Sequence, residues 1–216
     1  MPDESERAKR IVRAVYSAAA ERLYEPLVVH GTFPLLAGKM PDLVREQGRK
    51  AVALAAGRPI LDLPVGTGYY TVPTAREHDG LIVGVDIAWG MVLRAAEVAN
   101  ENGLDNLRTL QGDVHRLPFP DGAFAAILCT NGLQVIPGLR PSLSELARVL
   151  APGGSLFVSV ITLPTTRLRP NRKDRRPTWM LAGAHIAEAI ADTGLHVTSR
   201  NRERLATLIE ATKPIP

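Results

Sequence analysis

Three aspartates in this chain lie at or next to the end of a predicted strand, and two glycines come shortly after the first of them. Asp62 is followed by Gly66 and Gly68, while Asp86 and Asp113 end two later predicted strands. Continuous apolar runs are typical of buried parallel strands. A glycine turn lets the backbone approach a ligand closely, because glycine has no Cβ. The pattern therefore predicts a ligand site at the carboxyl ends of a parallel sheet.

The first two acidic residues suit different groups of such a ligand. Asp86 follows the glycine turn at about the spacing at which dinucleotide-binding folds place an acid for a ribose. Asp62 lies just before the turn, where its carboxylate can accept a hydrogen bond from an ammonium group or a loop amide. A glycine turn by itself is a weak signal. The prediction depends on the ordered set of carboxylates.

Apolar runs that alternate with helical patterns must position these residues. We expect seven strands, at residues 60–63, 80–86, 107–113, 124–130, 155–161, 195–201 and 205–211. Helical patterns occupy residues 41–56, 89–102, 139–150 and 185–193, and residues 151–154 are expected to form a tight turn. Pro73 requires the helix after the glycine turn to start late enough to keep this proline in its first turn. The alternation predicts an α/β fold, a doubly wound and mostly parallel sheet with helices on both faces.

The N-terminal part of the chain differs from the rest. Residues 4–23 have apolar positions at a helical period and a charged opposite face, which indicates an amphipathic helix. Prolines and a glycine make residues 24–34 irregular. We therefore expect an N-terminal helical segment at residues 1–56 and a main domain at residues 57–216, with a basic loop insert at residues 162–180.

The composition is that of an ordinary globular protein. With 45% hydrophobic and 22% charged residues, 216 residues suit one domain with an appended segment. No apolar run reaches the ~20 residues that a membrane-spanning helix needs, and the first residues lack a signal peptide's apolar segment. The single cysteine, Cys129, lies in an apolar run and is expected to be a core residue. These features predict a cytoplasmic protein, and the sequence has no zinc-ligand spacing.

The net charge is +4, and residues 167–176 contribute most of the excess of basic over acidic residues. Such a block is either a solvated loop or an anion site, and the sequence leaves both open. The chain has no array of aromatic residues for stacking on bases. The sequence therefore argues against nucleic acid as a partner. It leaves open whether the protein forms a homo-oligomer.

Four stretches in this order resemble one known family: LDLPVGTG, GVDIAWGMVLRA, GDVHRLPFPDGAFAAILCTNGLQVI and LARVLAPGGSLFVSV. They are similar to class I S-adenosylmethionine-dependent methyltransferases, the group that includes the ubiquinone and menaquinone C-methyltransferases and many small-molecule methyltransferases. The resemblance covers roughly residues 50–216. It implies a Rossmann-like methyltransferase fold whose last strand is antiparallel. It also implies S-adenosyl-L-methionine as cofactor and S-adenosyl-L-homocysteine as product.

The resemblance also implies how the cofactor is held. The turn from Gly66 to Gly68 would hold the methionine and ribose part, Asp86 would bond the ribose hydroxyls, and Asp113 with the Val114 amide would read the adenine. The cofactor residues predicted in this domain are Asp62, Gly66, Thr67, Gly68, Asp86, Ile87, Met91, Asp113, Val114 and Asn131, with Ile87 and Met91 lining the adenine pocket.

Pro64 is a departure from the family, which usually has glycine at this position. Proline removes a backbone donor and fixes φ near its own preferred value. Because Gly66 and Gly68 are retained, we expect a slightly different loop and not a lost site.

In the resembling family, the N-terminal segment folds over the cofactor as a lid. Tyr16 and Tyr24 are therefore predicted to contact the cofactor, the alternative being that each packs on its own helix with the hydroxyl in solvent. His30 is the candidate general base, the alternative being a surface histidine. His115 is expected to face solvent.

The acceptor would meet the sheet beside the first and fourth strands, where doubly wound folds bind ligands. Asn131 and Gln134 follow the fourth strand and are predicted to meet cofactor and substrate, the alternative being a turn that hydrogen-bonds itself. Trp179 is predicted to supply an apolar wall for an aromatic acceptor.

Three functional classes follow from these residues. The leading one is methyl transfer to a small hydroxylated metabolite, such as a quinol or a phenol. A nicotinamide-dependent oxidoreductase is the first alternative, but residues 64–70 lack its glycine pattern and Asp113 has no role in it. The second alternative is a non-catalytic, cofactor-binding regulatory protein, which Pro64 suggests.

Overall fold

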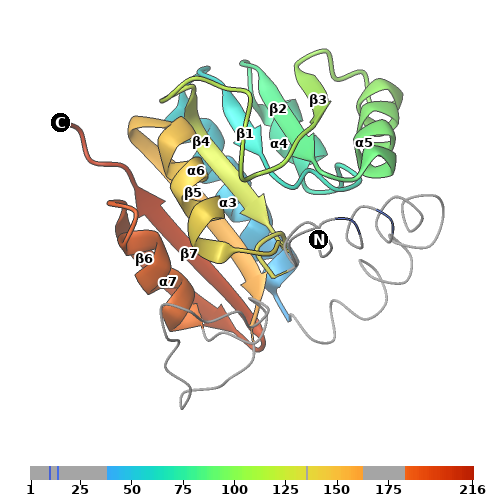
Figure 1. Cartoon of the computed structure of the whole chain (residues 1–216). Helices are drawn as coiled ribbons and strands as arrows, with labels where there is room; N and C mark the ends of the chain where they lie inside the picture. The colour runs from blue at the N-terminus through green and yellow to red at the C-terminus, as the bar shows by residue number, and fades with distance from the viewer. Residues whose placement is uncertain (1–9, 11–13, 15–37, 135, 163–182) are drawn as a thin grey trace.

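The computed structural model describes residues 38–134, 136–162 and 183–216, together with Arg10 and Ala14. These residues form one sheet with helices on both faces (Figure 1). The strands are β1 (Ile60–Asp62), β2 (Ile82–Asp86), β3 (Leu107–Gln111), β4 (Phe124–Thr130), β5 (Leu150–Ile161), β6 (His196–Glu203) and β7 (Ala206–Thr212). The helices are α3 (Met40–Ala55), α4 (Thr71–Glu77), α5 (Trp89–Glu101), α6 (Leu139–Val149) and α7 (Gly183–Ala191).

The strand order is β3-β2-β1-β4-β5-β7-β6. The first five strands pair in parallel, and β7 is inserted antiparallel between β5 and β6. The predicted fold is confirmed, including the antiparallel last strand. Because the chain moves outward from β1 to β3 and then returns to β4, the strand order reverses beside β1. The carboxyl ends of the parallel strands share one edge, and this reversal is where such folds bind ligands.

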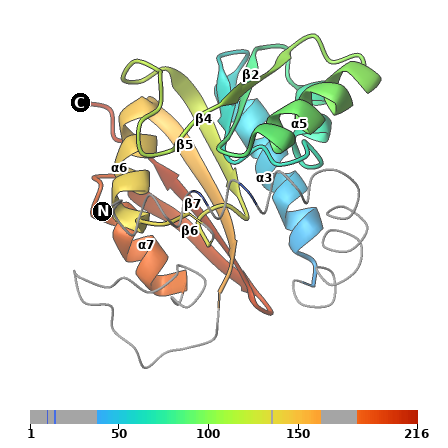
Figure 2. The ribbon, with the colours of Figure 1, turned by 45° about the vertical axis from the view of Figure 1, so that its right-hand side comes forward.

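Helices cover both faces of the sheet (Figure 2), and each face buries an apolar cluster. On one face, α6 and α7 pack through a cluster that includes Leu143, Leu146 and Ile186. On the other face, α3, α4 and α5 pack mainly through alanines, among them Ala51 and Ala75. Small side chains bring these helices close to the strands. The helix α3, which lies within the expected N-terminal segment, is therefore part of the sheet's own packing.

The helix α4 begins at Thr71, so Pro73 lies in its first turn, as predicted. The first four N–H groups of a helix have no partner within the helix. A proline there removes no helical hydrogen bond. The proline thus fits a helix that starts late.

The predicted turn at residues 151–154 is wrong, because β5 already begins at Leu150. This segment pairs with the chain that follows β7: Gly153 N–H donates to the Lys213 carbonyl at 2.9 Å, and Lys213 N–H donates to the Gly154 carbonyl at 2.9 Å. The pairing of β4 with β5 shifts register there. A partner distant in sequence therefore converts a local turn signal into strand.

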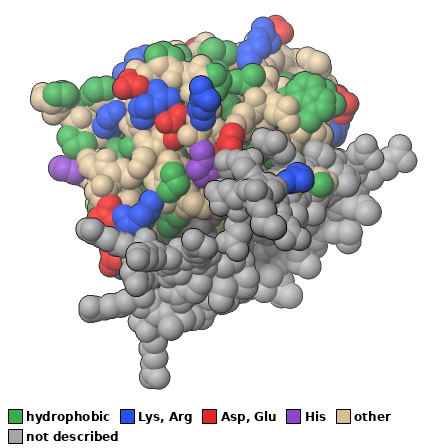
Figure 3. Space-filling view, viewed as in Figure 1, with side chains coloured by type: hydrophobic (Ala, Val, Ile, Leu, Met, Phe, Trp, Pro, Cys, Tyr) green, Lys and Arg blue, Asp and Glu red, His purple; other side chains and the backbone are tan. Residues whose placement is uncertain are grey.

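On the face shown in Figure 3, basic and acidic side chains of the described residues are interspersed and form no single basic field. None of the helices in the described part of the chain has the length and hydropathy that crossing a membrane requires.

Candidate functional site

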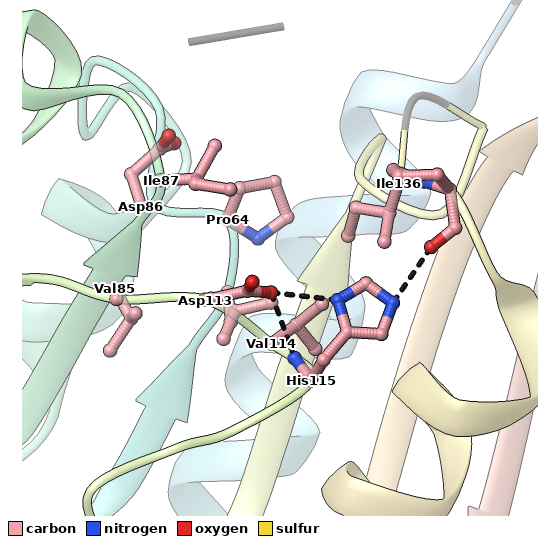
Figure 4. A pocket seen from close by; sticks show the side chains of 11 residues that line it. Pro64, Val85, Asp86, Ile87, Asp113, Val114, His115 and Ile136 are labelled. Atoms are coloured by element: carbon pink, nitrogen blue, oxygen red, sulfur yellow. Dashed lines mark hydrogen bonds and ion pairs between the residues drawn. The ribbon is translucent and has the colours of Figure 1, made fainter. Parts of the chain in front are cut away.

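A pocket lies at the carboxyl ends of the strands and has about 390 Å³ of space open to solvent. Most of its walls are apolar, and the polar side chains are two carboxylates and one histidine (Figure 4). The lining consists of Leu63, Pro64, Val85, Asp86, Ile87, Gly112, Asp113, Val114, His115, Ile136 and Pro137.

At the end of β1, Asp62 is 3% exposed and lies beneath the glycine turn. Its Oδ2 atom accepts a hydrogen bond of 2.5 Å from the Thr71 hydroxyl at the start of α4. Burial raises the pKa of Asp62 to about 7; the Thr71 bond opposes this shift and the nearby Asp86 adds to it. A buried carboxylate with one hydroxyl donor is poised to take a cationic partner.

The glycine turn keeps the geometry that a ligand would need. Gly66 and Gly68 both have positive φ, at 55° and 83°, where glycine carries no steric cost. A Cβ on Gly66 would meet nothing within 4 Å. The turn is held to β2 by the Val65 N–H, which donates to the Val85 carbonyl at 2.9 Å.

Pro64 lies in the wall of the pocket and packs against the backbone after β4. A Cβ built on Gly132 would lie 2.1 Å from the Pro64 Cδ atom, too close for any side chain. Sequence reasoning identified Pro64 as unusual but missed this glycine. The signal was the glycine two residues after β4, which only the fold brings against the proline.

At the end of β2, Asp86 is 6% exposed and also lines the pocket. Its Oδ2 accepts from the Gly66 N–H at 3.1 Å, and its Oδ1 accepts from the Ala88 N–H at 2.9 Å. Burial raises the pKa of Asp86, and these backbone bonds act in the opposite direction. The carboxylate thus joins the glycine turn to the start of α5, and Ile87 lies beside it in the lining.

Asp113 follows β3 by two residues, after Gly112 N–H has bonded to the Asp86 carbonyl at 2.9 Å. Its Oδ1 accepts from the His115 backbone N–H at 3.0 Å and lies 2.7 Å from the His115 Nδ1. Val114 lines the pocket between them. The expectation that His115 faces solvent is wrong: its side chain is 17% exposed and bonded on both ring nitrogens.

Other predicted cofactor residues lie outside the pocket lining. Met91 is 1% exposed inside α5, and Thr67 is buried in the turn. Asn131 has a φ of 53° and bonds through its N–H to the Ser159 carbonyl at 2.8 Å. Gln134 Nε2 lies 3.5 Å from the Asn131 Oδ1, as expected for the alternative in which this turn bonds itself. The Gln134 Oε1 atom is buried without a partner among the described residues.

Tyr16, Tyr24, His30 and Trp179 lie outside the described residues, as does almost all of the basic loop insert. The described residues contain no group of three or more His, Cys, Asp or Glu side chains that could hold a metal ion. The site as described is a mostly apolar pocket with two carboxylates, which follow β2 and β3.

Comparison with known proteins agrees with this geometry. Residues 60–154, which carry the glycine turn, Asp86 and Asp113, match the family described as a methyltransferase domain. Residues 60–154 thus match a methyltransferase domain, in line with the resemblance to class I S-adenosylmethionine-dependent methyltransferases. The family resemblance of the sequence is thereby confirmed.

The methyltransferase domain has close relatives in sequence. Over 114 residues it is 42% identical to a demethylmenaquinone methyltransferase of Thermus thermophilus, an alignment that covers 51% of this chain and 51% of the relative. The chain spans about half the length of the curated relatives it matches.

Solved structures share the fold of the methyltransferase domain. An S-adenosylmethionine-dependent methyltransferase from Aquifex aeolicus superposes with a TM-score of 0.66 at 21% identity, covering 84% of this chain and 92% of that one. The cyclase SpnF superposes with a TM-score of 0.73 at 21% identity, covering 81% of this chain and 82% of that one. At these identities the likeness concerns the fold alone.

Proposed function

We propose that this protein transfers a methyl group from S-adenosylmethionine to a small-molecule acceptor. The observation that carries the proposal is the pair of carboxylates, Asp86 and Asp113, which follow the neighbouring strands β2 and β3 and line one apolar pocket. When bound, the cofactor supplies an electrophilic methyl group on a sulfonium. A ribose offers two hydroxyl donors and an adenine offers an amino donor, and carboxylates are suited to accept both.

Each wall of the pocket has a role in this proposal. Asp86 would accept from the ribose hydroxyls, and its two backbone bonds hold the carboxylate in place for them. Ile87 and Val114 would contact the adenine, and Asp113 would accept from its amino group. Pro64 narrows the pocket beside them. The backbone of Gly66 and Gly68 approaches the methionine part because neither residue has a Cβ.

Asp62, just before the glycine turn, is the carboxylate that would interact with the methionine ammonium. Its carboxylate is buried, and its pKa is raised to about 7. A cation that arrives beside it favours the charged form and lowers that pKa. Cofactor binding near pH 7 should therefore release a proton from this residue.

Methyl transfer is an in-line displacement, and the protein's contribution is to hold donor and acceptor in line. Such positioning can supply ~7–11 kcal/mol without a covalent residue. Gln134 and Trp179 would contact the methyl acceptor. The Gln134 Oε1 atom is buried and has no partner among the described residues. His30 would serve as general base for an acceptor that must lose a proton. Tyr16 and Tyr24 would close over the cofactor as part of a lid.

A quinol or a phenol is the acceptor class that we favour. The sequence relatives include demethylmenaquinone methyltransferases, and the loop insert at residues 162–180 is rich in basic residues. A cationic rim raises the local concentration of anionic substrates, and salt screens it over ~8–10 Å. Changing Arg172, Lys173, Arg175 and Arg176 together to Ser should lower kcat/KM and its salt dependence. If kcat/KM changes by less than about twofold both when salt is added to the wild type and when the four residues are replaced, the loop plays no steering role.

The lid proposal concerns the residues before α3. Deleting residues 1–38 should lower activity more than it lowers the melting temperature, because α3 and the sheet keep their packing. A truncated chain that unfolds, or that methylates normally, would contradict the lid.

The proposal is tested by ligand-dependent stability and by turnover. S-adenosylhomocysteine should raise the melting temperature and NADH should not, since a ligand stabilises the state that binds it. Transfer of a labelled methyl group to a panel of quinols and phenols then identifies the acceptor. Stabilisation by NADH alone would favour an oxidoreductase. Stabilisation by S-adenosylhomocysteine with no transfer to any acceptor would favour the regulatory protein.

A further inference from the structure

His115 connects two chain segments that face each other across the pocket (Figure 4). Its Nδ1 lies 2.7 Å from the Asp113 Oδ1, on the segment that follows β3. Its Nε2 lies 2.8 Å from the Pro137 carbonyl oxygen, on the segment between β4 and α6. Both segments line the pocket. The imidazole is therefore a bridge between two walls.

The sheet itself does not set the distance between these walls. In the strand order β3-β2-β1-β4, two other strands separate β3 from β4. Asp113 and Pro137 both lie in loops beyond the ends of their strands. Farther from the pocket, Glu145 and Arg148 of α6 bond the loop after β3 at Leu117 and Phe119. Where the two loops line the pocket, the His115 imidazole contacts both of them.

The helix α6 fixes the imidazole from its far side. The Ser142 hydroxyl donates to the Gly138 carbonyl at 2.8 Å and lies 3.3 Å from the His115 Nε2. A Cβ on Gly138, which has a φ of 78°, would lie 3.1 Å from the same nitrogen. A side chain at this position would therefore crowd the imidazole.

The same bridge fixes the Asp113 carboxylate. Its Oδ1 atom accepts from the backbone N–H of His115 and also contacts the ring, so two bonds from one residue set its orientation. A carboxylate held in this way can accept a hydrogen bond from a ligand amino group without first losing rotational freedom. A loose carboxylate would bind the amino group less selectively.

We propose that His115 is a positioning residue for adenine: its imidazole, which also contacts the Pro137 carbonyl through Nε2, orients the Asp113 carboxylate for the 6-amino group through Nδ1. This inference rests on the proposed function and goes beyond it, because it assigns adenine selectivity to a residue that does not itself read the base. Its signature is selectivity for the 6-amino group and not affinity alone.

The test compares S-adenosylhomocysteine with its 6-deamino analogue, in which purine replaces adenine, by calorimetry on the full chain. The wild type should prefer the adenine ligand by about tenfold or more, the effect of one hydrogen bond to a charged group. His115→Ala should reduce this preference to within about twofold. His196→Ala, which removes an exposed histidine on β6, is the matched control and should keep the wild-type preference.

Two conservative variants separate positioning from a merely structural role. His115→Asn keeps a donor near the Nδ1 position and should retain the preference, whereas His115→Gln keeps one near the Nε2 position and should lose it. If His115→Ala does not fold, the comparison of His115→Asn with His115→Gln tests the proposal in its place. An unchanged preference in folded His115→Ala or His115→Gln would overturn the inference, even if both ligands bind more weakly. A wild type that binds neither ligand would overturn the proposed function as well.

Discussion

The ends of β1 and β2 each bury one aspartate, and the two carboxylates are held in different ways. Asp86 accepts two backbone N–H bonds and lines the pocket. Asp62 accepts one side-chain bond, from Thr71, and is absent from the pocket lining. Burial is the largest cause of a raised pKa in both. Two residues with the same side chain and similar burial therefore differ in what stabilises their charge.

This difference indicates separate roles within one cofactor site. A carboxylate supported by fixed backbone donors keeps its position whether or not a ligand is bound, which suits the recognition of neutral hydroxyls. A carboxylate with little support changes its protonation when a cation arrives, which couples binding to pH. The end of β2 would thus recognise the ribose, and the end of β1 would respond to the charge of the methionine part.

Asp62→Asn should give the largest effect, an increase in the stability of the ligand-free protein at pH 8. The folded-state pKa of about 7 exceeds the ordinary aspartate value of 3.8, so the folded state binds more protons between these values and stability falls as pH rises from about 4 to 7. The full shift in pKa corresponds to about 4 kcal/mol in the free energy of unfolding, and we expect Asp62→Asn to gain about 2–4 kcal/mol at pH 8. Urea unfolding at pH 5 and pH 8 measures it.

The control for Asp62→Asn is Asp105→Asn, which removes one carboxylate from the surface. Asn keeps an oxygen for the Thr71 hydroxyl, so the hydrogen bond itself survives the change. If Asp62→Asn were no more stable than the wild type at pH 8, the contrast between the two strand ends would fail.

Asp86→Ala should weaken the binding of S-adenosylhomocysteine by roughly ten- to a hundredfold, because two charge-assisted bonds to the ribose are lost. Calorimetry on the folded variant measures this change, and near-ultraviolet circular dichroism checks the fold. Asp79→Ala, at an exposed position shortly before β2, is the control. Unchanged affinity in folded Asp86→Ala would remove Asp86 from the cofactor site.

Gly132→Ala should lower the free energy of unfolding by about 1–3 kcal/mol, since its Cβ would lie 2.1 Å from the Pro64 Cδ. Replacing Pro64 by Gly removes the clashing ring, so the double variant should lose less stability than the sum of the two single changes. Strict additivity in denaturant unfolding would show that the two residues do not share this space.

The sequence was sufficient for the fold and for the order of the acidic residues. Continuous apolar runs and helical periods depend on local sequence, and they located every strand within a few residues. The turn predicted at residues 151–154 failed because Lys213, far away in sequence, pairs with it. His115 was misplaced for a similar reason: its partner Pro137 follows a different strand, and no local pattern indicates that contact.

A crystal structure of the complex with S-adenosylhomocysteine would test most directly whether this pocket binds the cofactor. The ribose hydroxyls should lie within hydrogen-bond distance of Asp86, the adenine should lie between Ile87 and Val114, and its amino group should face Asp113. Adenine density elsewhere, or a ribose that does not contact Asp86, would contradict the assignment of this pocket to the cofactor.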